Sequence, residues 1–191
     1  MGAVSLIRIS GDEAIGITER LIGKDLSAVK GYSIVYGTIK DHGEPVDDVL
    51  VSVFRAPKSY TGEDVIEVGC HGGVYITHRI LSLVMGQGAR MARRGEFTQR
   101  AYLNGKMDLS QAEGVNDLIN AKDSNAAKSA MHSLKGSVSA ILAPLLEDLT
   151  QIISNMEVNI DYPEYEDVHQ MTEDEIIPMC TKWLDGIHAV I

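Results

Sequence analysis

The chain has 191 residues, of which 45% are hydrophobic and 23% are charged, a composition that is ordinary for a soluble globular protein. No apolar run approaches the roughly 18–20 residues that a membrane-spanning helix needs, so we expect no membrane association. Cys70 and Cys180 are too few for a disulfide framework or a cysteine-rich metal site. Because no signal peptide opens the chain, we expect a cytoplasmic protein.

The net charge of −10 is unevenly distributed along the chain. Residues 147–191 carry the whole acidic excess, and Lys182 is their only basic side chain. An acidic segment repels phosphate, so we do not expect it to bind nucleic acid. The densest basic stretch lies earlier, and either a solvated loop or a contact with an anionic ligand or RNA would account for it. Its basic residues are Arg90, Arg93, Arg94, Arg100 and Lys106.

The first part of the chain mixes strand and helix signals. Alternation over Val4–Ser10 predicts a strand that turns two isoleucines to one face and Arg8 to the other. Residues 10–13 resemble a capping box, which predicts a helix that begins there and ends at Gly23. This mixture predicts an α+β domain. Further strands are predicted over residues 33–40, 46–55, 64–70 and 89–92, and a further helix over residues 74–85.

Beyond residue 107 almost every signal is helical. Apolar residues recur at helical spacings, with a break at Asp123 where Ser124 or Asn125 is expected to cap a second helix. That helix is predicted to run for about 35 residues, roughly 50 Å, with a kink at Pro144. A capping box at residues 172–175 begins a final amphipathic segment. Because so long a helix needs partners along its apolar side, we expect an incomplete helical bundle.

Four stretches carry a specific resemblance to a known family. They are residues 6–11, 59–73, 94–113 and 159–164, and they follow one another in this order. Together they resemble the MnmE (TrmE) family of tRNA modification GTPases, from near the start of that family to the residues just before its G domain. The similarity covers essentially the whole chain.

The resemblance implies a fold and a ligand. The α+β fold would comprise a mixed-sheet, aminomethyltransferase-like domain over residues 1–107 that binds tetrahydrofolate and forms a homodimer. A partial α-helical domain would follow over residues 108–191, without the G domain and the C-terminal part. The ligand would be 5-formyl-tetrahydrofolate or another tetrahydrofolate derivative, whereas GTP, Mg²⁺ and K⁺ serve only the full-length proteins of the family.

The resemblance also implies partners. MnmE proteins act with the flavoprotein MnmG to add an aminomethyl-type group to carbon 5 of the wobble uridine of tRNA, which they meet through that complex. The folate is expected to supply the one-carbon unit. We therefore expect this chain to act as a folate-binding and dimerising fragment that contains no catalytic residue of its own.

Three residues match the folate-contact positions of the family, namely Arg8, Glu67 and Lys106. A pterin presents a ring N–H beside an exocyclic amine, and one carboxylate can accept both donors, which suits Glu67. The glutamate tail and the ring carbonyl suit Arg8 and Lys106, and the sequence does not decide which cation faces which end. By spacing alone, each of the three would be an ordinary exposed side chain. We expect no metal site, since His71 beside Cys70 is more simply a structural turn.

The chain departs from the family in two respects. It contains no Gly-x-x-x-x-Gly-Lys-[Ser/Thr] phosphate loop, so we expect no GTP hydrolysis. About a dozen residues that form a first strand in the family are missing before Gly2, so we expect a truncated chain with a bare sheet edge. Two other functions remain open. One is a dimerisation scaffold with no folate bound, and the other is a stand-alone aminomethyltransferase, which the lack of further domains disfavours.

Overall fold

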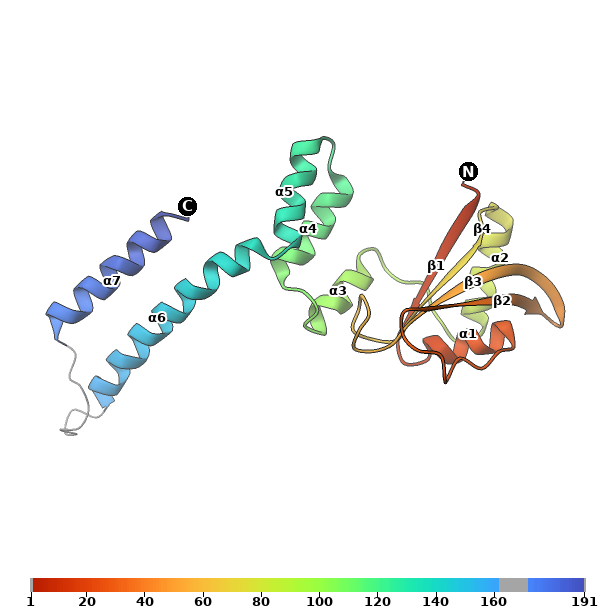
Figure 1. The fold of residues 1–191 in the computed structure, drawn as a ribbon, viewed down its shortest axis with the longest axis horizontal. Coiled ribbons are helices and arrows are strands. Elements are labelled where there is room, and N and C mark those ends of the chain that lie inside the picture. Colours follow the sequence, from red (N-terminus) through yellow and green to blue (C-terminus); the bar gives the residue numbers. More distant parts are fainter. Residues whose placement is uncertain (1, 162–171, 191) are drawn as a thin grey trace. The chain divides into compact units, whose positions relative to one another are not determined.

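The structure is a computed structural model that describes residues 2–161 and 172–190. The chain divides into two compact units, Met1–Ala112 and Glu113–Ile191, whose elements are drawn in Figure 1. Strands occur in the first unit, and the described residues of the second unit are helical or in short connections, which confirms the α+β class. In chain order the elements up to the start of the second unit are β1 (Val4–Ser10), α1 (Ala14–Ile22), β2 (Ser33–Asp41), β3 (Glu44–Phe54), β4 (Val65–His71), α2 (Val74–Gly86), α3 (Glu96–Leu103) and α4 (Leu109–Asn120).

The four strands form one sheet in the order β1-β4-β3-β2, and every pairing is antiparallel. Ser10 pairs with Val65, which pairs with Phe54, and Ser33 pairs with Val53, so these residues share one end of the sheet. The chain therefore leaves β1 and enters β2 at the same end. A parallel pair requires a crossover that returns the chain to the starting end. Because α1 and its loop make no such crossover, the described sheet is antiparallel and not mixed.

The two strands predicted over residues 33–40 and 46–55 are β2 and β3, and they form a hairpin whose turn is tighter than the gap between the predicted ranges. The strands extend to Asp41 and Glu44, so only His42 and Gly43 connect them, with φ angles of 49° and 89°. Positive φ at both central residues matches the twist of the strands, and glycine adopts it without steric cost.

One face of the sheet is buried beneath α1 and α2. Side chains alternate between the two faces of a strand, and the inward set joins apolar residues of both helices in a single cluster. The burial of Ile7 and Ile9 confirms the faces expected for β1, and Val49, Val51 and Val53 of β3 are buried in the same alternating way. Burial of this apolar surface stabilises the unit and fixes the sheet against its helices.

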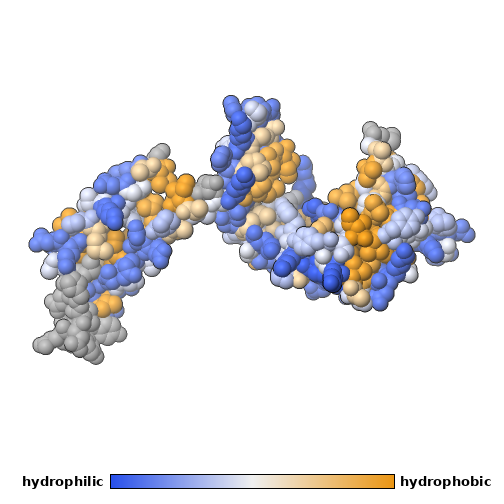
Figure 2. All heavy atoms as spheres, viewed as in Figure 1, coloured by the Kyte–Doolittle hydropathy of each residue, from blue (hydrophilic) through white to orange (hydrophobic). Residues whose placement is uncertain are grey.

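The opposite face of the sheet, which we term the open face, keeps large apolar side chains exposed. Figure 2 shows apolar residues gathered over the strands of this unit. A contiguous exposed apolar surface of this kind is typical of a site for a ligand or partner. The exposed apolar residues of the open face include Val4, Leu6, Ile34, Tyr36 and Leu50.

The start of α1 differs from the capping box that the sequence predicts. Its N-cap is Glu13, which makes no side-chain cap bond. The Ser10 hydroxyl instead bonds the Thr61 hydroxyl and donates to the Glu63 carboxylate, both at 2.7 Å. The Ser10 side chain thus binds the loop between β3 and β4 and does not cap the helix. The helix end at Gly23, where φ is 64°, is confirmed.

The strand predicted over residues 89–92 is absent, since these described residues adopt no regular secondary structure. Ala89 packs against the core cluster, and the Arg90 guanidinium binds Glu96. Side-chain contacts therefore fix this stretch in place of ladder hydrogen bonds.

The single long helix expected in the second unit is two helices. Gly136, with a φ of 75°, interrupts it between α5 (Ser124–Leu134) and α6 (Ser137–Asp161), because a left-handed residue cannot continue the helix. Pro144 lies inside α6. No single described helix is long and apolar enough to cross a membrane, although α5 and most of α6, bent by 41°, reach that length and composition as a pair.

The helix caps of the second unit were predicted in part. Asp123, and not Ser124 or Asn125, caps α5, and its carboxylate accepts from two backbone N–H groups of the first turn. The capping box predicted at residues 172–175 is present at the start of α7 (Glu173–His188). Aspartate, serine and asparagine accept N-cap hydrogen bonds about equally well, so residue type alone does not decide which of residues 123–125 caps α5.

Replacement of Ile66 by alanine should destabilise the first unit by about 2–5 kcal/mol, because it leaves a cavity in the core. Ile66 lies on the inner face of β4 and has 0% of its surface exposed. The matched variant Val4→Ala changes the open face, where Val4 is 73% exposed, and should cost less than about 0.5 kcal/mol. Urea denaturation measures both free energies of unfolding, and equal losses would contradict the two-faced sheet.

Candidate functional site

A charged pair lies on the open face. The register of β1 and β4 puts Arg8 directly beside Glu67. The Arg8 guanidinium binds Oε1 of Glu67 through Nε at 2.7 Å and Nη2 at 2.5 Å. The two side chains keep 35% and 19% of their surface exposed, so neither charge is fully withdrawn from solvent. Among the described residues, no hydrogen bond occupies the second carboxylate oxygen, Oε2.

Two aromatic rings flank the Arg8 guanidinium. Its central carbon lies 5.4 Å from the ring centroid of Tyr60 and 5.5 Å from that of Phe97. At these distances the cation is attracted to the face of an aromatic ring. The Tyr60 hydroxyl also bonds the hydroxyl of Thr98, the neighbour of Phe97, at 2.9 Å. The carboxylate and the two rings together restrict the position of the guanidinium.

The loop of residues 55–64, between β3 and β4, contacts Lys106 as well as Arg8. The Lys106 Nζ donates to the backbone carbonyl of Pro57 at 3.0 Å. The Lys106 stem lies against Gly62, where an added Cβ would come within 3.2 Å of the lysine Cγ. Since Tyr60 belongs to the same loop, this segment contacts Arg8 and Lys106, and Arg8 in turn binds Glu67. It does not bring the Lys106 ammonium into contact with Arg8 or Glu67.

A chain of ion pairs fixes α3 to this loop. Arg100 donates to both oxygens of Glu63, at 3.1 and 3.0 Å, and to Glu96 at 3.1 Å. Arg90 binds the Glu96 carboxylate through both of its amino groups. The Arg90 guanidinium, followed by the Arg93 backbone N–H, holds the pKa of Glu96 well below its usual range. Because Phe97 follows Glu96 directly, these pairs also set the position of the ring that flanks Arg8.

The ion pairs indicate the role of two arginines in the basic stretch of residues 90–106, which could be either a solvated loop or a contact with an anionic ligand or RNA. Arg90 and Arg100 each neutralise buried or half-buried carboxylates of their own unit, so they present less positive charge to a ligand than their number suggests. For these two residues the structure favours a structural role over RNA contact.

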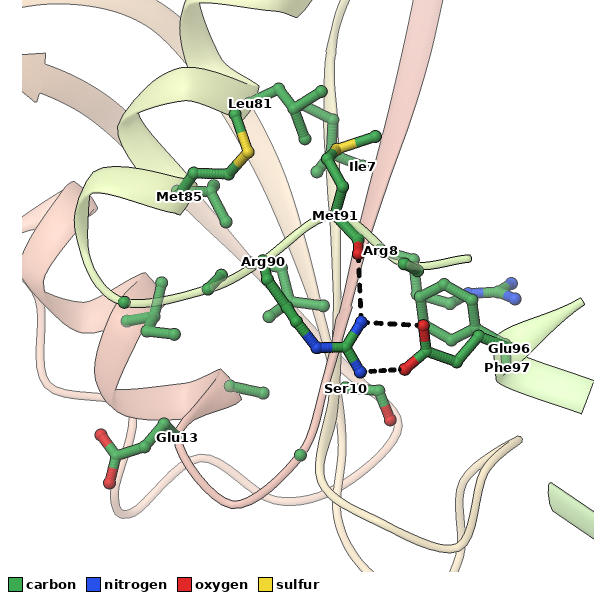
Figure 3. A pocket seen from close by; sticks show the side chains of 18 of the residues that line it. Ile7, Arg8, Ser10, Glu13, Leu81, Met85, Arg90, Met91, Glu96 and Phe97 are labelled. Carbon is green, nitrogen blue, oxygen red and sulfur yellow. Dashed lines mark hydrogen bonds and ion pairs between the residues drawn. The ribbon is translucent and has the colours of Figure 1, made fainter. Parts of the chain in front are cut away.

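A cavity of about 610 Å³ runs beside β1, the edge strand of the sheet. Figure 3 shows leucine and methionine side chains on one side of it and the Arg90–Glu96 ion pair on another. Arg8 lines this cavity, whereas Glu67 and Lys106 do not. The cavity is therefore distinct from the place where the Glu67 carboxylate could accept hydrogen bonds from a ligand.

His71 ends β4 and is bonded to β3. Its backbone N–H donates to Oδ2 of Asp47 at 2.9 Å, and its ring Nδ1 lies 2.5 Å from Oδ1. In the parts of the chain that the structure describes, no three His, Cys, Asp or Glu side chains are grouped as a metal ion would require.

Sequence reasoning singled out Arg8 and Glu67, which the strand register places side by side, but it overlooked the rings around them. Tyr60 and Phe97 lie within the stretches that carry the family resemblance. Nothing in their local pattern marks them as neighbours of Arg8, because the contact depends on how the loop and α3 fold back onto β1.

The fold and the site define a protein of two parts, an α+β unit with a charged pair on its open sheet face and a helical unit that follows it. The family described as "GTP-binding protein TrmE N-terminus" matches residues 1–106, and the "MnmE helical domain" matches residues 109–191. The chain therefore belongs to the MnmE (TrmE) family of tRNA modification proteins. This confirms the resemblance drawn from four stretches, of which residues 162–164 lie outside the described residues.

The similar curated proteins are much longer than this chain. The chain is 46% identical to the tRNA modification GTPase MnmE of Lactiplantibacillus plantarum, over 100% of this chain and 42% of that protein. It is 43% identical to the MnmE of Bacillus cytotoxicus with the same coverage. It is 49% identical to the MnmE of Geobacillus thermodenitrificans, over 90% of this chain and 38% of the relative. The chain thus spans about two fifths of the length of these relatives.

The variant Glu96→Gln should lose stability in a pH-dependent way. Because the pKa of Glu96 in the folded chain lies below the reference value of 4.5, its ion pairs stabilise the fold above that pH and lose their effect as the pH falls further. The melting temperatures of wild type and Glu96→Gln should therefore differ most near neutral pH and converge in acid. The control Glu44→Gln changes an exposed residue of the hairpin and should follow wild type throughout. A pH-independent difference for Glu96→Gln would contradict the role of the ionised carboxylate.

Proposed function

We propose that this chain is the folate-binding and dimerising part of a tRNA-modifying GTPase, with a domain over residues 1–107 and a partial helical domain over residues 108–191. The observation that supports it best is the Arg8–Glu67 pair on the open face. Oε2 of Glu67 accepts no hydrogen bond from the described residues, so both of its lone pairs are available to a ligand, whereas Oε1 accepts from Nε and Nη2 of Arg8. The carboxylate can therefore accept the ring N–H and the exocyclic amine of 5-formyl-tetrahydrofolate.

The geometry also supports one orientation of that ligand. Arg8 binds the carboxylate through Nε and Nη2, so its remaining amino group, Nη1, can donate to the ring carbonyl of a pterin that Glu67 holds. Lys106 does not contact Arg8 or Glu67 and binds the Pro57 carbonyl instead. Its ammonium carries three donors and bonds one acceptor there, so it remains able to bind the anionic glutamate tail.

The variant Glu67→Gln should bind 5-formyl-tetrahydrofolate about ten- to hundredfold more weakly than wild type, because it loses a charge-assisted pair of hydrogen bonds worth about 1.5–3 kcal/mol. Isothermal titration calorimetry measures the two dissociation constants. The control Glu13→Gln removes an exposed carboxylate of the first unit that lines the cavity beside β1, and it should bind as wild type does.

The alternative function, a dimerisation scaffold with no folate bound, predicts a different outcome for the same titration. Wild type would then release no heat at millimolar ligand, and Glu67→Gln would be indistinguishable from it. That result would refute folate binding and leave the proposal of a dimer intact.

The wider function rests on the family. We propose that the complete protein acts with the flavoprotein MnmG on the wobble uridine of tRNA, with 5-formyl-tetrahydrofolate or a related folate as the one-carbon source. GTP, Mg²⁺ and K⁺ would bind outside the residues of this chain, whose sequence contains no phosphate loop. The contribution of these residues would be to bind and orient the folate, while the one-carbon chemistry belongs to the cofactor.

A homodimer is supported by the exposed apolar side chains on the outer face of β2, which include Ile34 and Tyr36. Closed two-fold pairing is the commonest way in which soluble proteins cover such a surface. Sedimentation equilibrium should give twice the chain mass of 20.8 kDa. The variant Ile34→Glu should shift the equilibrium to the monomer. Monomeric wild type at high concentration would contradict the dimer.

A further inference from the structure

A gap between the side chains of the open face, which we term the hollow, lies next to Glu67 along β4. Side chains two residues apart share a face of a strand, so Gly69 follows Glu67 on the open face. The register places Gly69 between Leu6 of β1 and Leu50 of β3. These leucines are 58% and 54% exposed, and between them glycine contributes no side chain. The sheet backbone is therefore partly exposed at this point, with an apolar side chain on either side and a carboxylate at one end.

We infer that the ring of the ligand lies over Gly69, with the face of the ring on the strand backbone and its edges between Leu6 and Leu50. We term this position of the ring the seat. This inference rests on the proposed folate function and extends it to the residue that admits the ring. The chemistry of the hollow selects a broad, nearly flat heterocycle whose polar edge carries two adjacent N–H donors. A ring in this seat would direct that edge to Glu67 and keep its faces in contact with apolar groups.

The local geometry separates a binding role for Gly69 from a structural one. An added Cβ at Gly69 would meet only the backbone oxygen of Leu50, at an ordinary contact distance of 3.6 Å. Gly37 on β2 differs, because an added Cβ there would come within 3.2 Å of the Ile22 side chain. The fold therefore tolerates alanine at position 69, and glycine is needed there only if something outside the sheet approaches the backbone.

The test compares Gly69→Ala with wild type in two measurements. Thermal unfolding should show a melting temperature equal to or above that of wild type, because alanine restricts the unfolded chain and fits the strand. The affinity for 5-formyl-tetrahydrofolate, measured by calorimetry, should fall by about tenfold or more, since a methyl group then occupies the seat. A purely structural role cannot lower affinity while stability is maintained.

The matched control is Gly73→Ala. Gly73 precedes α2 with a φ of −68°, which alanine adopts freely, and an added Cβ there meets nothing within 4 Å. This variant should bind folate as wild type does. If wild type binds folate and Gly69→Ala binds it equally well, the seat is refuted and the proposed function stands. If wild type binds no folate, the proposed function fails and the seat fails with it.

A second measurement on wild type keeps the inference falsifiable should Gly69→Ala fold poorly. Nuclear Overhauser contacts between protons of the reduced pterin ring and the methyl groups of Leu6 and Leu50 are expected in the complex. Contacts to the methionine methyl groups of the cavity beside β1 in their place would overturn the inference.

Discussion

The ion pair between Arg8 and Glu67, 59 residues apart in the sequence, depends on the register of β1 and β4. A slip of β1 by one residue would turn Arg8 into the core and both isoleucines of β1 out to solvent, while Glu67 would stay on the open face. Burial of Ile7 and Ile9 against α1 and α2 prevents that slip. The packing of the inner face therefore determines which side chains meet on the open face, and the site is a consequence of the core.

Around this pair, the 55–64 loop and α3 act as one support. The Arg100 bridge between Glu63 and Glu96 joins the loop to the helix, and each of the two segments contributes a ring to the environment of Arg8. The Glu96 carboxylate in this support is buried, whereas its partners Arg90 and Arg100 are partly exposed. The shared carboxylates hold the loop and α3 in one arrangement.

Much of this fold could be predicted from the sequence, and the failures have a common cause. Period-two alternation identified β1 and its inner face, since burial on one side imposes that pattern. The predicted cap at Ser10 is wrong because the Ser10 hydroxyl binds Glu63 of the 55–64 loop. The predicted strand over residues 89–92 is wrong because the Arg90 side chain binds Glu96. The hollow at Gly69 could not be foreseen either. Alternation gives the face of a glycine, but the leucines beside it follow from the strand order β1-β4-β3-β2, which no local pattern specifies.

Membership of the MnmE family and the geometry of the open face lead to one central claim, that the Glu67 carboxylate receives a folate on the uncovered side of the sheet. The most direct test is a crystal structure of the chain with 5-formyl-tetrahydrofolate. The account predicts the pterin on the open face with its ring N–H and amine within hydrogen-bonding distance of Glu67. A ligand bound in the cavity beside β1, with Glu67 still engaged only by Arg8, would contradict it.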